Sequence, residues 1–465
     1  MNEIKKNDVF TVKIEDISEE GLGIGHIEGM AVFVKDTAPG DLADVKIVKL
    51  KKNYAFGRLE KIIEPAECRT EPDCPVARQC GGCTLQHISY ETELEMKKKR
   101  VLSCMERIGG IEKPEEYLEG IFGMDSPYRY RNKMQFPVGY AKDPRDGAVL
   151  GFYAGRTHDI IPVGDCLIGH EVNCAITKDI KKWIDSNGVP VYDEKTGTGL
   201  VRHILTRVGF KTGELMVCIV SKEKTVPEIE KLVNALINDS ALSEAGVKLT
   251  SVVVNRNNER TNRILGRKTF TVWGESYITD YIGDIQFRIS AESFYQVNPV
   301  QTEKLYGKAL EYAALTGTEN VWDMYCGIGT ISLFLAKNAA KVYGVEIVDR
   351  AIQDAKLNAE INEIKNAEFF VGKAEEVVPE WKKNGGKDID VIVVDPPRKG
   401  CDEKLLETIS EISPKRMVYV SCDPATLARD LKILLAKGFK LEKFSIYDQF
   451  ARSMHVETVV QLLGK

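Results

Sequence analysis

The segment SCDPATLARD places Cys422 where thiolate chemistry can occur. Asp423 is a good helix N-cap and Pro424 a good first helical residue, so a helix is predicted to begin there. Cys422 then lies directly before the helix N-terminus, where the dipole and free amides lower the pKa of a thiol. His455 and Glu457 alternate along HVETVV, so both can face one side at the start of a strand. A carboxylate beside a thiol favours covalent chemistry, and the alternative is a core cysteine at a strand end.

A glycine turn, DMYCGIGT, follows another predicted strand. Gly327 and Gly329 permit a tight turn and close approach of the backbone to a ligand. The next strand ends in Glu346, which can accept hydrogen bonds from both ribose hydroxyls of an adenosine cofactor. A later strand ends in VVDPPRKG, which places Asp395 at the same edge of the predicted sheet. The absence of a third glycine argues against a pyrophosphate, so the pattern predicts S-adenosylmethionine.

Four of the eleven cysteines fall within sixteen residues, in the pattern C-x5-C-x5-C-x2-C. They are Cys68, Cys74, Cys80 and Cys83. Such density outside an oxidising compartment indicates metal binding. Four thiolates suit zinc as well as an iron–sulfur cluster, so the residues alone leave both ligands open.

Positive charge is concentrated locally although the formal net charge of the chain is −5. Residues 46–61 contain six Lys or Arg against one acid, and further basic stretches lie at 129–145 and 256–268. A single basic patch is usually a solvated face. Three patches on an acidic chain indicate a confined footprint for a polyanion such as RNA.

The segment YRYRNKMQF combines aromatic and basic side chains. Guanidinium groups grip phosphates, and aromatic rings stack on unpaired bases. We therefore predict RNA contacts from Tyr128, Arg129, Arg131 and Lys133, and the alternative for the tyrosines is packing on one face of a strand.

The periodicity of the chain predicts a multidomain α/β protein. Residues 1–62 alternate apolar and polar positions between turns, which predicts a small β-barrel. Residues 63–290 are expected to form a central, mostly antiparallel α+β domain that holds the cysteines, with one clear helix near 225–238. A helix over 86–115 is expected to pack on the catalytic domain. From 291 to 465, strands and helices alternate, which predicts a doubly wound, Rossmann-like domain with ligands at the carboxyl ends of its strands.

Length and composition limit the class of protein. The 465 residues suffice for roughly three domains. No apolar run approaches the roughly 20 residues that span a bilayer, and MNEIKKNDVF has no apolar signal region. We therefore expect a cytoplasmic protein without a membrane partner and without a disulfide framework, and we expect a monomer.

Several of these motifs resemble one family. SCDPATLARD, DPPRKG, HVETVVQL and SFYQVNPVQTEKLY are similar to motifs of the RNA uridine-5 (m5U) methyltransferases. Within that family the chain resembles the 23S ribosomal RNA branch, which carries an N-terminal, OB-like TRAM domain and an iron–sulfur cluster. The resemblance covers the chain nearly from end to end.

The resemblance implies roles for individual residues. Cys422 would be the nucleophile and Glu457 the base. The cofactor contacts of the family fall on Gln296, Tyr325, Glu346 and Asp395. Thr330 and Lys373 also correspond to cofactor contacts, but some members have Asn at the first position and Asn or Asp at the second.

The family's cluster signature is similar to CPVARQCGGC. It implies that Cys74, Cys80 and Cys83, together with the distant Cys166, hold a [4Fe–4S] cluster, with zinc as the alternative. Cys68 would have no part in it. The cluster would tie the central domain together and shape the RNA-binding surface.

The implied reaction adds the Cys422 thiolate to C6 of uracil, which makes C5 nucleophilic toward the methyl group of the cofactor. Glu457 then removes the C5 proton so that the cysteine can leave. Among the rival cysteines, Cys326 is expected to line the cofactor pocket and Cys401 to be structural. The implied substrate is 23S rRNA.

Three alternatives remain for the activity. A tRNA uridine-5 methyltransferase would use the same residues on another RNA. An adenine-nitrogen methyltransferase would give Cys422 and Glu457 no purpose. A non-catalytic RNA-binding protein with an iron–sulfur cluster would not need the intact cofactor edge and both catalytic residues.

Overall fold

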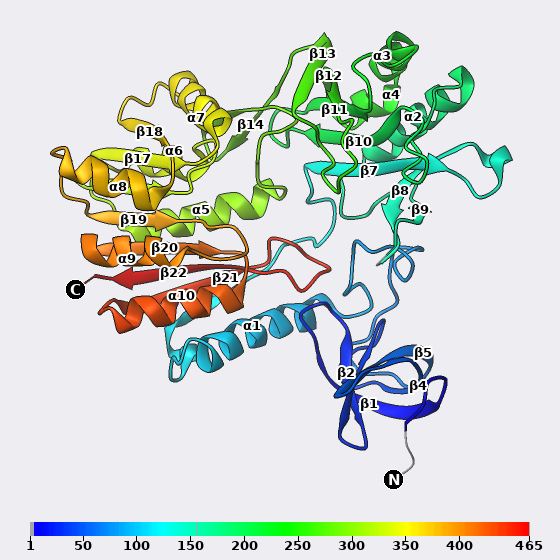
Figure 1. Ribbon diagram of the computed structural model, residues 1–465, viewed down its shortest axis with the longest axis horizontal. Helices are drawn as coiled ribbons and strands as arrows, with labels where there is room; N and C mark the ends of the chain where they lie inside the picture. The colour runs from blue at the N-terminus through cyan, green and yellow to red at the C-terminus, as the bar shows by residue number, and fades with distance from the viewer. Residues whose placement is uncertain (1–3, 156, 465) are drawn as a thin grey trace.

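The computed structural model describes residues 4–155 and 157–464, and Figure 1 shows three parts. The N-terminal part is a closed barrel in the order β1-β2-β3-β5-β4. Its strands are β1 (Val9–Ile17), β2 (Gly23–Ile27), β3 (Met30–Val34), β4 (Leu42–Leu50) and β5 (Tyr54–Glu64). Val32, Val45 and Ala55 are buried inside the barrel, while the residues directly before and after each of them along its strand are more exposed. This alternation is the one that the sequence predicted.

The central part is a seven-stranded sheet in the order β13-β12-β11-β10-β7-β8-β9, antiparallel except for the parallel pair of β11 and β12. Its strands are β7 (Lys133–Tyr140), β8 (Ala148–Tyr153), β9 (Ile160–Pro162), β10 (Val201–Val208), β11 (Glu214–Ser221), β12 (Lys248–Arg256) and β13 (Lys268–Gly274). A short 3-10 helix, η2 (Pro144–Asp146), joins β7 to β8.

Three helices accompany this sheet: α2 (Asn173–Asn187), α3 (Ile229–Asn238) and α4 (Ser240–Glu244). Helix α3 corresponds to the one helix predicted near 225–238, but the sequence interpretation missed α2. Ile176, Ile180 and Trp183 repeat at helical spacing in α2 and are buried in the core of the sheet. The N-cap position of α2 is Val172, which makes no side-chain capping bond, so the usual start signal is missing.

The C-terminal part is an eight-stranded sheet in the order β18-β17-β16-β19-β20-β22-β21-β6. Its strands are β16 (Asn320–Met324), β17 (Lys341–Glu346), β18 (Ala367–Val371), β19 (Val391–Val394), β20 (Arg416–Ser421), β21 (Lys440–Tyr447), β22 (Glu457–Leu463) and β6 (Leu118–Phe122). Strands β16 to β20 are mutually parallel, and β22 is antiparallel to both neighbours.

Helices flank this sheet as the alternation of strands and helices predicted. They are α5 (Pro299–Ala313), α6 (Thr330–Ala336), α7 (Asp349–Ile361), α8 (Ala374–Lys383), α9 (Glu403–Ile412) and α10 (Pro424–Ala436). A hairpin of β14 (Ile278–Ile282) and β15 (Ile285–Ile289) leads from the central sheet into α5. The hairpin shares one hydrophobic core with residues of both sheets, including Leu205, Met216 and Val393.

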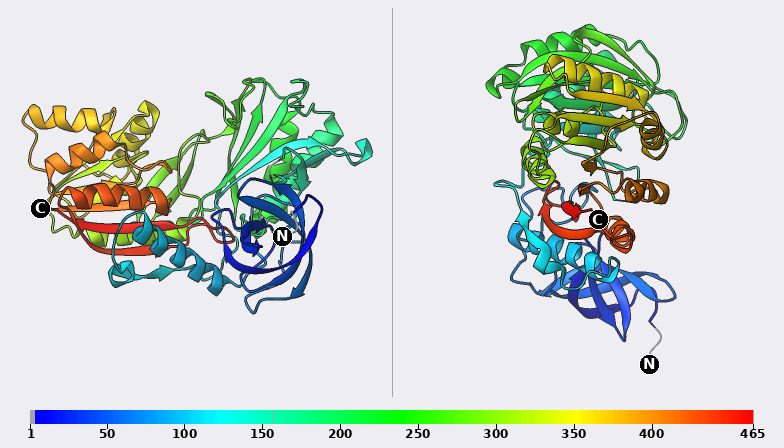
Figure 2. Two further views of the ribbon diagram at one scale, coloured as in Figure 1. Left: turned by 60° about the horizontal axis from the view of Figure 1, so that its bottom comes forward. Right: turned by 90° about the vertical axis from the view of Figure 1, so that its left-hand side faces the viewer.

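The chain between the barrel and the central sheet joins the C-terminal sheet. Helix α1 (Tyr90–Arg107) lies against α10, with Val101 and Met105 in the same core as β19 and β20 (Figure 2). The 3-10 helix η1 (Pro114–Tyr117) leads into β6, which pairs in parallel with β21. The helix that the sequence predicted over 86–115 is shorter in the structure, because α1 ends at Arg107, and the edge strand β6 was not predicted. Within the described residues, no helix is both long enough and apolar enough to cross a bilayer.

Candidate active site

A pocket of about 870 Å³ opens at the carboxyl ends of β16, β17, β19 and β20. It has the size of a pocket that binds a small ligand or cofactor. The sequence motifs converge here although they are far apart along the chain. Of the nine residues expected to act in catalysis or to bind the cofactor, eight line the pocket: Gln296, Tyr325, Gly327, Thr330, Glu346, Asp395, Cys422 and Glu457.

The ninth residue, Gly329, belongs to the turn rather than to the wall. Its φ of 84° is accessible to glycine at little cost, and an added Cβ would lie 3.3 Å from Ala355 and Phe369. Gly327 has a φ of 52°, and a Cβ there would meet open space. Tyr325 has a φ of 139°, an unusual backbone conformation for a side chain of this size. The turn therefore holds strain beside the wall of the pocket.

Acidic groups dominate the wall of the pocket. Six acids and three cations line it. The acids are Asp323, Glu346, Glu375, Asp395, Asp402 and Glu457, and the cations are Lys373, Arg398 and Lys399. Burial and then the neighbouring Asp323 raise the pKa of Asp395 to about 7. Burial is also the main cause that raises the pKa of Asp323 to about 7. A cationic ligand would relieve the repulsion among these carboxyls.

One carboxyl oxygen in this wall has no partner. Asp323 is completely buried at the end of β16, and its Oδ2 accepts a hydrogen bond of 2.6 Å from Ser332. Its Oδ1 makes none. Asp323 is the first residue of the motif DMYCGIGT, but the sequence interpretation gave it no role. Its place near the carboxyl end of the first parallel strand was a signal that it faces the ligand. Glu346 differs, because one of its oxygens accepts from the Val348 amide at 3.0 Å.

Cys422 directly follows β20, and Glu457 is the first residue of the neighbouring strand β22. Ser421 of β20 pairs with Thr458 of β22 in antiparallel register, so the next position along places Cys422 opposite Glu457. Burial, Glu457 and Asp395 raise the pKa of the Cys422 thiol to about 12, in that order of importance. Burial and Asp395 also raise the pKa of Glu457 well above its usual range. Both shifts favour the protonated form of each group in the ligand-free chain.

The expectation that the helix N-terminus lowers the pKa of Cys422 is wrong for this state. Asp423 caps α10 and accepts hydrogen bonds from the amides of Ala425 and Thr426, at 3.0 and 2.9 Å. The free amides of the helix are thus already used. Only Arg398, among the main neighbouring charges, acts to lower the pKa of the thiol.

The rival cysteines are less accessible. Cys326 lines the pocket but is 3% exposed, and burial raises the pKa of its thiol well above the usual range. Cys401 is 4% exposed and does not line the pocket. Cys422 is more open than either of them.

The structure adds Phe294 and Phe450 to the pocket, which sequence reasoning did not single out, and it places His455 there beside Glu457. Phe294 is 73% exposed, while Phe450 and His455 come from the chain between β21 and β22. The His455 ring lies 3.4 Å from a guanidinium nitrogen of Arg398. Aromatic residues directly before Gln296 and before HVETVV were a signal in the sequence, but only the fold brings them to one opening.

A second cavity, of about 290 Å³, is lined by Cys74, Cys80, Cys83 and Cys166. Cys68 lies elsewhere, with its thiol 3.6 Å from the carbonyl oxygen of Pro39. Burial, and to a smaller extent the other three thiols, act to raise the pKa of Cys83, which reaches about 12. Across residues 4–155 and 157–464, no group of three or more His, Cys, Asp or Glu side chains is placed to hold a metal ion. The four thiols surround a space rather than meet at a point.

Arg131 and Lys133 line the same cavity, and none of the acids that the structure describes does. Burial and the nearby Arg207 and Arg131 lower the pKa of Lys133 to about 7. A negatively charged occupant would reverse this effect. The four thiols are soft donors that suit an iron–sulfur cluster, and the cations beside them suit its negative charge.

Two side chains of the predicted RNA segment use their polar groups within the protein. Arg129 forms a bidentate ion pair with Asp165, at 2.6 and 2.7 Å, and donates to the carbonyl oxygen of Cys166. The Tyr128 hydroxyl donates to Asp73 at 2.6 Å. Arg129 therefore braces the loop that carries Cys166, and RNA contact through 128–133 stays a prediction.

Comparison with known proteins locates two families in the chain. The family described as tRNA (Uracil-5-)-methyltransferase matches residues 267–465, and the TRAM domain matches residues 4–59. An uncharacterized RNA methyltransferase of Bacillus cereus is 48% identical over 98% of this chain and 97% of its own length. A protein described in the same way from Clostridium acetobutylicum is 47% identical, over 98% of this chain and 97% of its own length.

One solved structure matches along nearly the whole chain. It is the Pyrococcus abyssi tRNA (uracil-54, C5)-methyltransferase in complex with S-adenosyl-L-homocysteine. The two chains are 27% identical, with a TM-score of 0.77, and the match covers 98% of this chain and 100% of the other.

Proposed function

The chain belongs to the RNA (uracil-5-)-methyltransferase family and depends on S-adenosylmethionine, and from this premise we propose covalent catalysis by Cys422 on a uridine in RNA. The observation that carries the proposal is the placement of Cys422 opposite Glu457, in the pocket that also holds the glycine turn and Asp395. An adenine-nitrogen methyltransferase would have no use for the thiol. A non-catalytic RNA-binding protein would have no use for either residue.

The thiolate of Cys422 adds to C6 of uracil, and the electron pair of the C5–C6 double bond moves toward C5 and O4. C5 would then take the methyl group that the sulfonium of the cofactor supplies, and the broken S–CH3 bond would leave its electron pair on a neutral thioether sulfur. Glu457, as a carboxylate, removes the proton from C5, the C5–C6 double bond forms again, and the bond from C6 to sulfur breaks with its electron pair returning to Cys422. The thiolate is regenerated, so one nucleophile serves every turnover.

S-adenosylmethionine supplies an electrophilic methyl group and a positive charge that lowers the pKa of each acid and thiol facing it. The residues of the wall suit this ligand. Glu346 has an oxygen without an amide partner for ribose hydroxyls, and Ile347 lines the pocket with 62% of its surface exposed, where an adenine ring can pack. The open side of Gly327 leaves space for the ligand to approach the backbone.

The uridine must leave any base stack to reach Cys422. Phe294 and Phe450 offer aromatic surface at the opening of the pocket, and Arg398 and Lys399 offer positive charge. Unpaired nucleotides in loops or bulges are therefore the favoured substrates.

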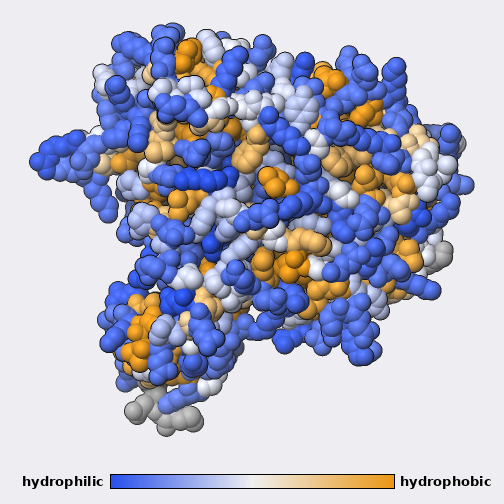
Figure 3. All heavy atoms as spheres, turned by 180° about the vertical axis from the view of Figure 1, so that it is seen from behind, coloured by the Kyte–Doolittle hydropathy of each residue, from blue (hydrophilic) through white to orange (hydrophobic). Residues whose placement is uncertain are grey.

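We assign a second RNA contact to the barrel. Phe33, Tyr54 and Phe56 point outward from β3 and β5, with ring centroids 5.6 to 5.8 Å apart. Lys49 pairs with Phe56 across β4 and β5, within the basic stretch 46–61. Exposed apolar side chains also gather on the barrel surface in Figure 3. Aromatic rings flanked by lysines suit single-stranded RNA.

The RNA class has two candidates. The four-cysteine segment supports 23S rRNA, through its resemblance to the rRNA branch of the family. The Pyrococcus abyssi protein, similar over nearly the whole chain, acts on uridine 54 of tRNA and supports the second candidate. Loss of 5-methyluridine from one RNA fraction of cells lacking the gene, and its return with the wild-type gene but not with Cys422→Ala, decides between them. Unchanged 5-methyluridine in both fractions contradicts the proposal.

We propose a [4Fe–4S] cluster in the second cavity, held by Cys74, Cys80, Cys83 and Cys166. The support is the shared cavity, the soft donors and the cations Arg131 and Lys133 without an opposing acid. Zinc is the alternative, and protein purified without air distinguishes the two by iron content and absorption. The proposed cluster has no step in methyl transfer, and its role is to hold the surrounding segments together.

A further inference from the structure

The chain between β21 and β22, residues 448–456, carries part of the active site without regular secondary structure. Phe450 and His455 line the pocket, and Glu457 follows at the first position of β22. Glu457 pairs with Tyr447 of β21, but no strand or helix ladder fixes residues 448–456. Their orientation therefore depends on contacts that the segment makes with other parts of the molecule.

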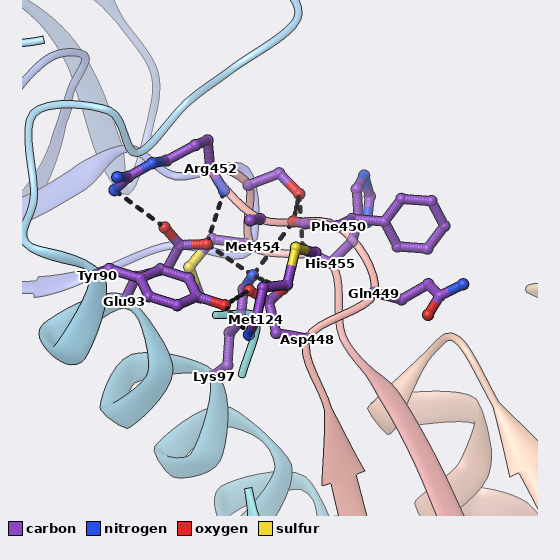
Figure 4. A network of polar contacts seen from close by, with 12 residues as sticks. Tyr90, Glu93, Lys97, Met124, Asp448, Gln449, Phe450, Arg452, Met454 and His455 are labelled. Carbon is purple, nitrogen blue, oxygen red and sulfur yellow. Dashed lines mark hydrogen bonds and ion pairs between the residues drawn. The ribbon is translucent and has the colours of Figure 1, made fainter. Parts of the chain in front are cut away.

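Lys97 holds this segment from the middle of α1. Its side chain is completely buried, and its ammonium group donates to Glu93 at 2.7 Å, to Asp448 at 2.6 Å and to the carbonyl oxygen of Phe450 at 3.2 Å (Figure 4). All three N–H bonds are thus used. Lys97 opens the basic run KKKR at 97–100, and nothing in that run separates it from the partly exposed Lys98 or the exposed Lys99.

The two carboxylates extend the contact along the segment. Glu93 accepts from the backbone amide of Arg452 at 2.8 Å, and its other oxygen lies 3.8 Å from the Arg452 guanidinium. Asp448 also accepts from the Tyr90 hydroxyl at 2.6 Å. One face of α1 therefore binds the segment at Asp448, Phe450 and Arg452.

Backbone carbonyl oxygens of the segment accept bonds from remote donors. Gln301 donates to the carbonyl oxygen of Asp448, Asn298 to that of Gln449, and Lys97 to that of Phe450. The Tyr130 hydroxyl donates to Ala451, the Thr84 and Leu85 amides donate to Arg452, and Arg100 donates to Met454. Buried carbonyls need such partners. Most of these donors help the segment fold, but Lys97 differs because one charged atom fixes two points on either side of Gln449.

We propose that Lys97 is a positioning residue for the methyltransferase reaction. Lys97 does not line the active-site pocket; it holds Asp448 and Phe450 so that the following residues bring Glu457 opposite Cys422. The inference rests on the proposed covalent mechanism. If Lys97 is lost, the step most affected is the one that needs Glu457, which is removal of the C5 proton and release of the enzyme from the RNA.

The test is Lys97→Met, assayed with the full-length protein, S-adenosylmethionine and an unmodified RNA substrate. We expect kcat to fall by about tenfold to a hundredfold, the loss typical of a displaced catalytic group, with KM for RNA within about twofold of wild type. The covalent protein–RNA adduct should accumulate at steady state, visible as a shifted band on a denaturing gel. A role limited to stability would lower the adduct together with the turnover.

Matched variants make the result decisive. Lys98→Met on the same helix removes a partly exposed ammonium and should behave as wild type in turnover and adduct level. Lys97→Met leaves two buried carboxylates with less compensation, so Glu93→Gln/Lys97→Met is tested beside it, and it should show the same accumulation. Adduct at or below the wild-type level in a folded variant overturns the inference, and so does failure of both Lys97 variants to fold.

Glu457→Gln separates this inference from the mechanism on which it rests. If Glu457→Gln accumulates adduct and a folded Lys97 variant does not, the positioning role fails alone. If neither wild type nor Glu457→Gln yields any adduct, the covalent mechanism itself fails.

Discussion

The active-site pocket and the four-cysteine cavity both contain buried thiols, but the charges around these thiols have opposite sign. Cys422 faces Asp395 and Glu457, whereas Arg131 and Lys133, and no acid within residues 4–155 and 157–464, line the cavity. Burial raises the pKa of a thiol in both places. The acids add to this effect at Cys422 and prepare the pocket for a cationic ligand, while the cations prepare the cavity for an anionic one.

The largest expected effect tests the chemical role of the first site. Cys422→Ala should lower turnover by at least about a thousandfold, because no other group can form the bond to C6. Methyl transfer from labelled cofactor to RNA measures it. Cys174→Ser, a change at a partly exposed thiol outside both sites, should retain wild-type activity. Near-normal methylation by Cys422→Ala would show that Cys422 is not the nucleophile and that the pocket thiol has no chemical role.

The next effect tests the second site. Cys166→Ser should abolish iron binding, since one of four ligands is lost from a loop that is held in place by Arg129. Iron content and visible absorption of protein purified without air give the answer. Cys68→Ser is the matched control, because Cys68 lies outside the cavity, and it should keep its iron. Equal iron in both variants would show that Cys166 is no ligand.

The pH dependence of alkylation sharpens the comparison. In ligand-free protein, the rate of Cys422 alkylation by iodoacetamide should rise about tenfold per pH unit from pH 7 to 9 without levelling off, because the thiol pKa is raised to about 12. Mass spectrometry of the Cys422 peptide measures this rate. The same peptide in denatured protein should level off near its usual pKa of about 8.5. A plateau of the alkylation rate near pH 7 in the folded protein would show that burial, Glu457 and Asp395 do not raise the pKa of the Cys422 thiol.

A smaller effect is expected from the cations of the cavity. Lys133→Met should retain the cluster but lower its reduction potential on the order of 50 to 100 mV, because a nearby positive charge favours the reduced, more negative state. Redox titration followed by electron paramagnetic resonance measures the shift. Lys35→Met, on the barrel side of the cysteines, should shift the potential less. An unchanged potential in Lys133→Met would show that its charge does not act on the cavity.

The smallest effect concerns the barrel, which has neither site. Tyr54→Ala should weaken RNA binding about tenfold through loss of stacking, with the salt dependence unchanged. Lys49→Ala should instead reduce the slope of log affinity against log salt by about one unit. Fluorescence anisotropy over a range of salt concentrations separates the two. Equal RNA affinity of both variants and wild type would show that these barrel residues do not contact the RNA.

Sequence reasoning predicted the active-site pocket better than its surroundings, for a physical reason. Glu346, Asp395 and Cys422 stand directly at strand ends, and parallel strands bring their carboxyl ends to one edge whatever the rest of the chain does. The barrel was predictable for a similar reason, since inward and outward residues alternate with period two. The same rule could have placed Asp323 in the pocket, but the sequence interpretation gave this residue no role.

The remaining features depend on contacts between distant segments. Nothing local distinguishes Lys97 from Lys98, because burial of one and exposure of the other follow from the rotation of α1 against the segment 448–456. The raised pKa of Cys422 likewise comes from Glu457 on another strand and from the capping of α10 by Asp423. Strand β6 joined the catalytic sheet through a crossing of the chain that periodicity cannot show.

Trapping with RNA that carries 5-fluorouridine tests the covalent role of Cys422 most directly. Fluorine at C5 cannot leave as a proton, so wild-type protein with S-adenosylmethionine should remain joined to the RNA, and digestion followed by mass spectrometry should place the nucleotide on the Cys422 peptide. The absence of any linkage, or a linkage through another residue such as Cys326, would contradict the account.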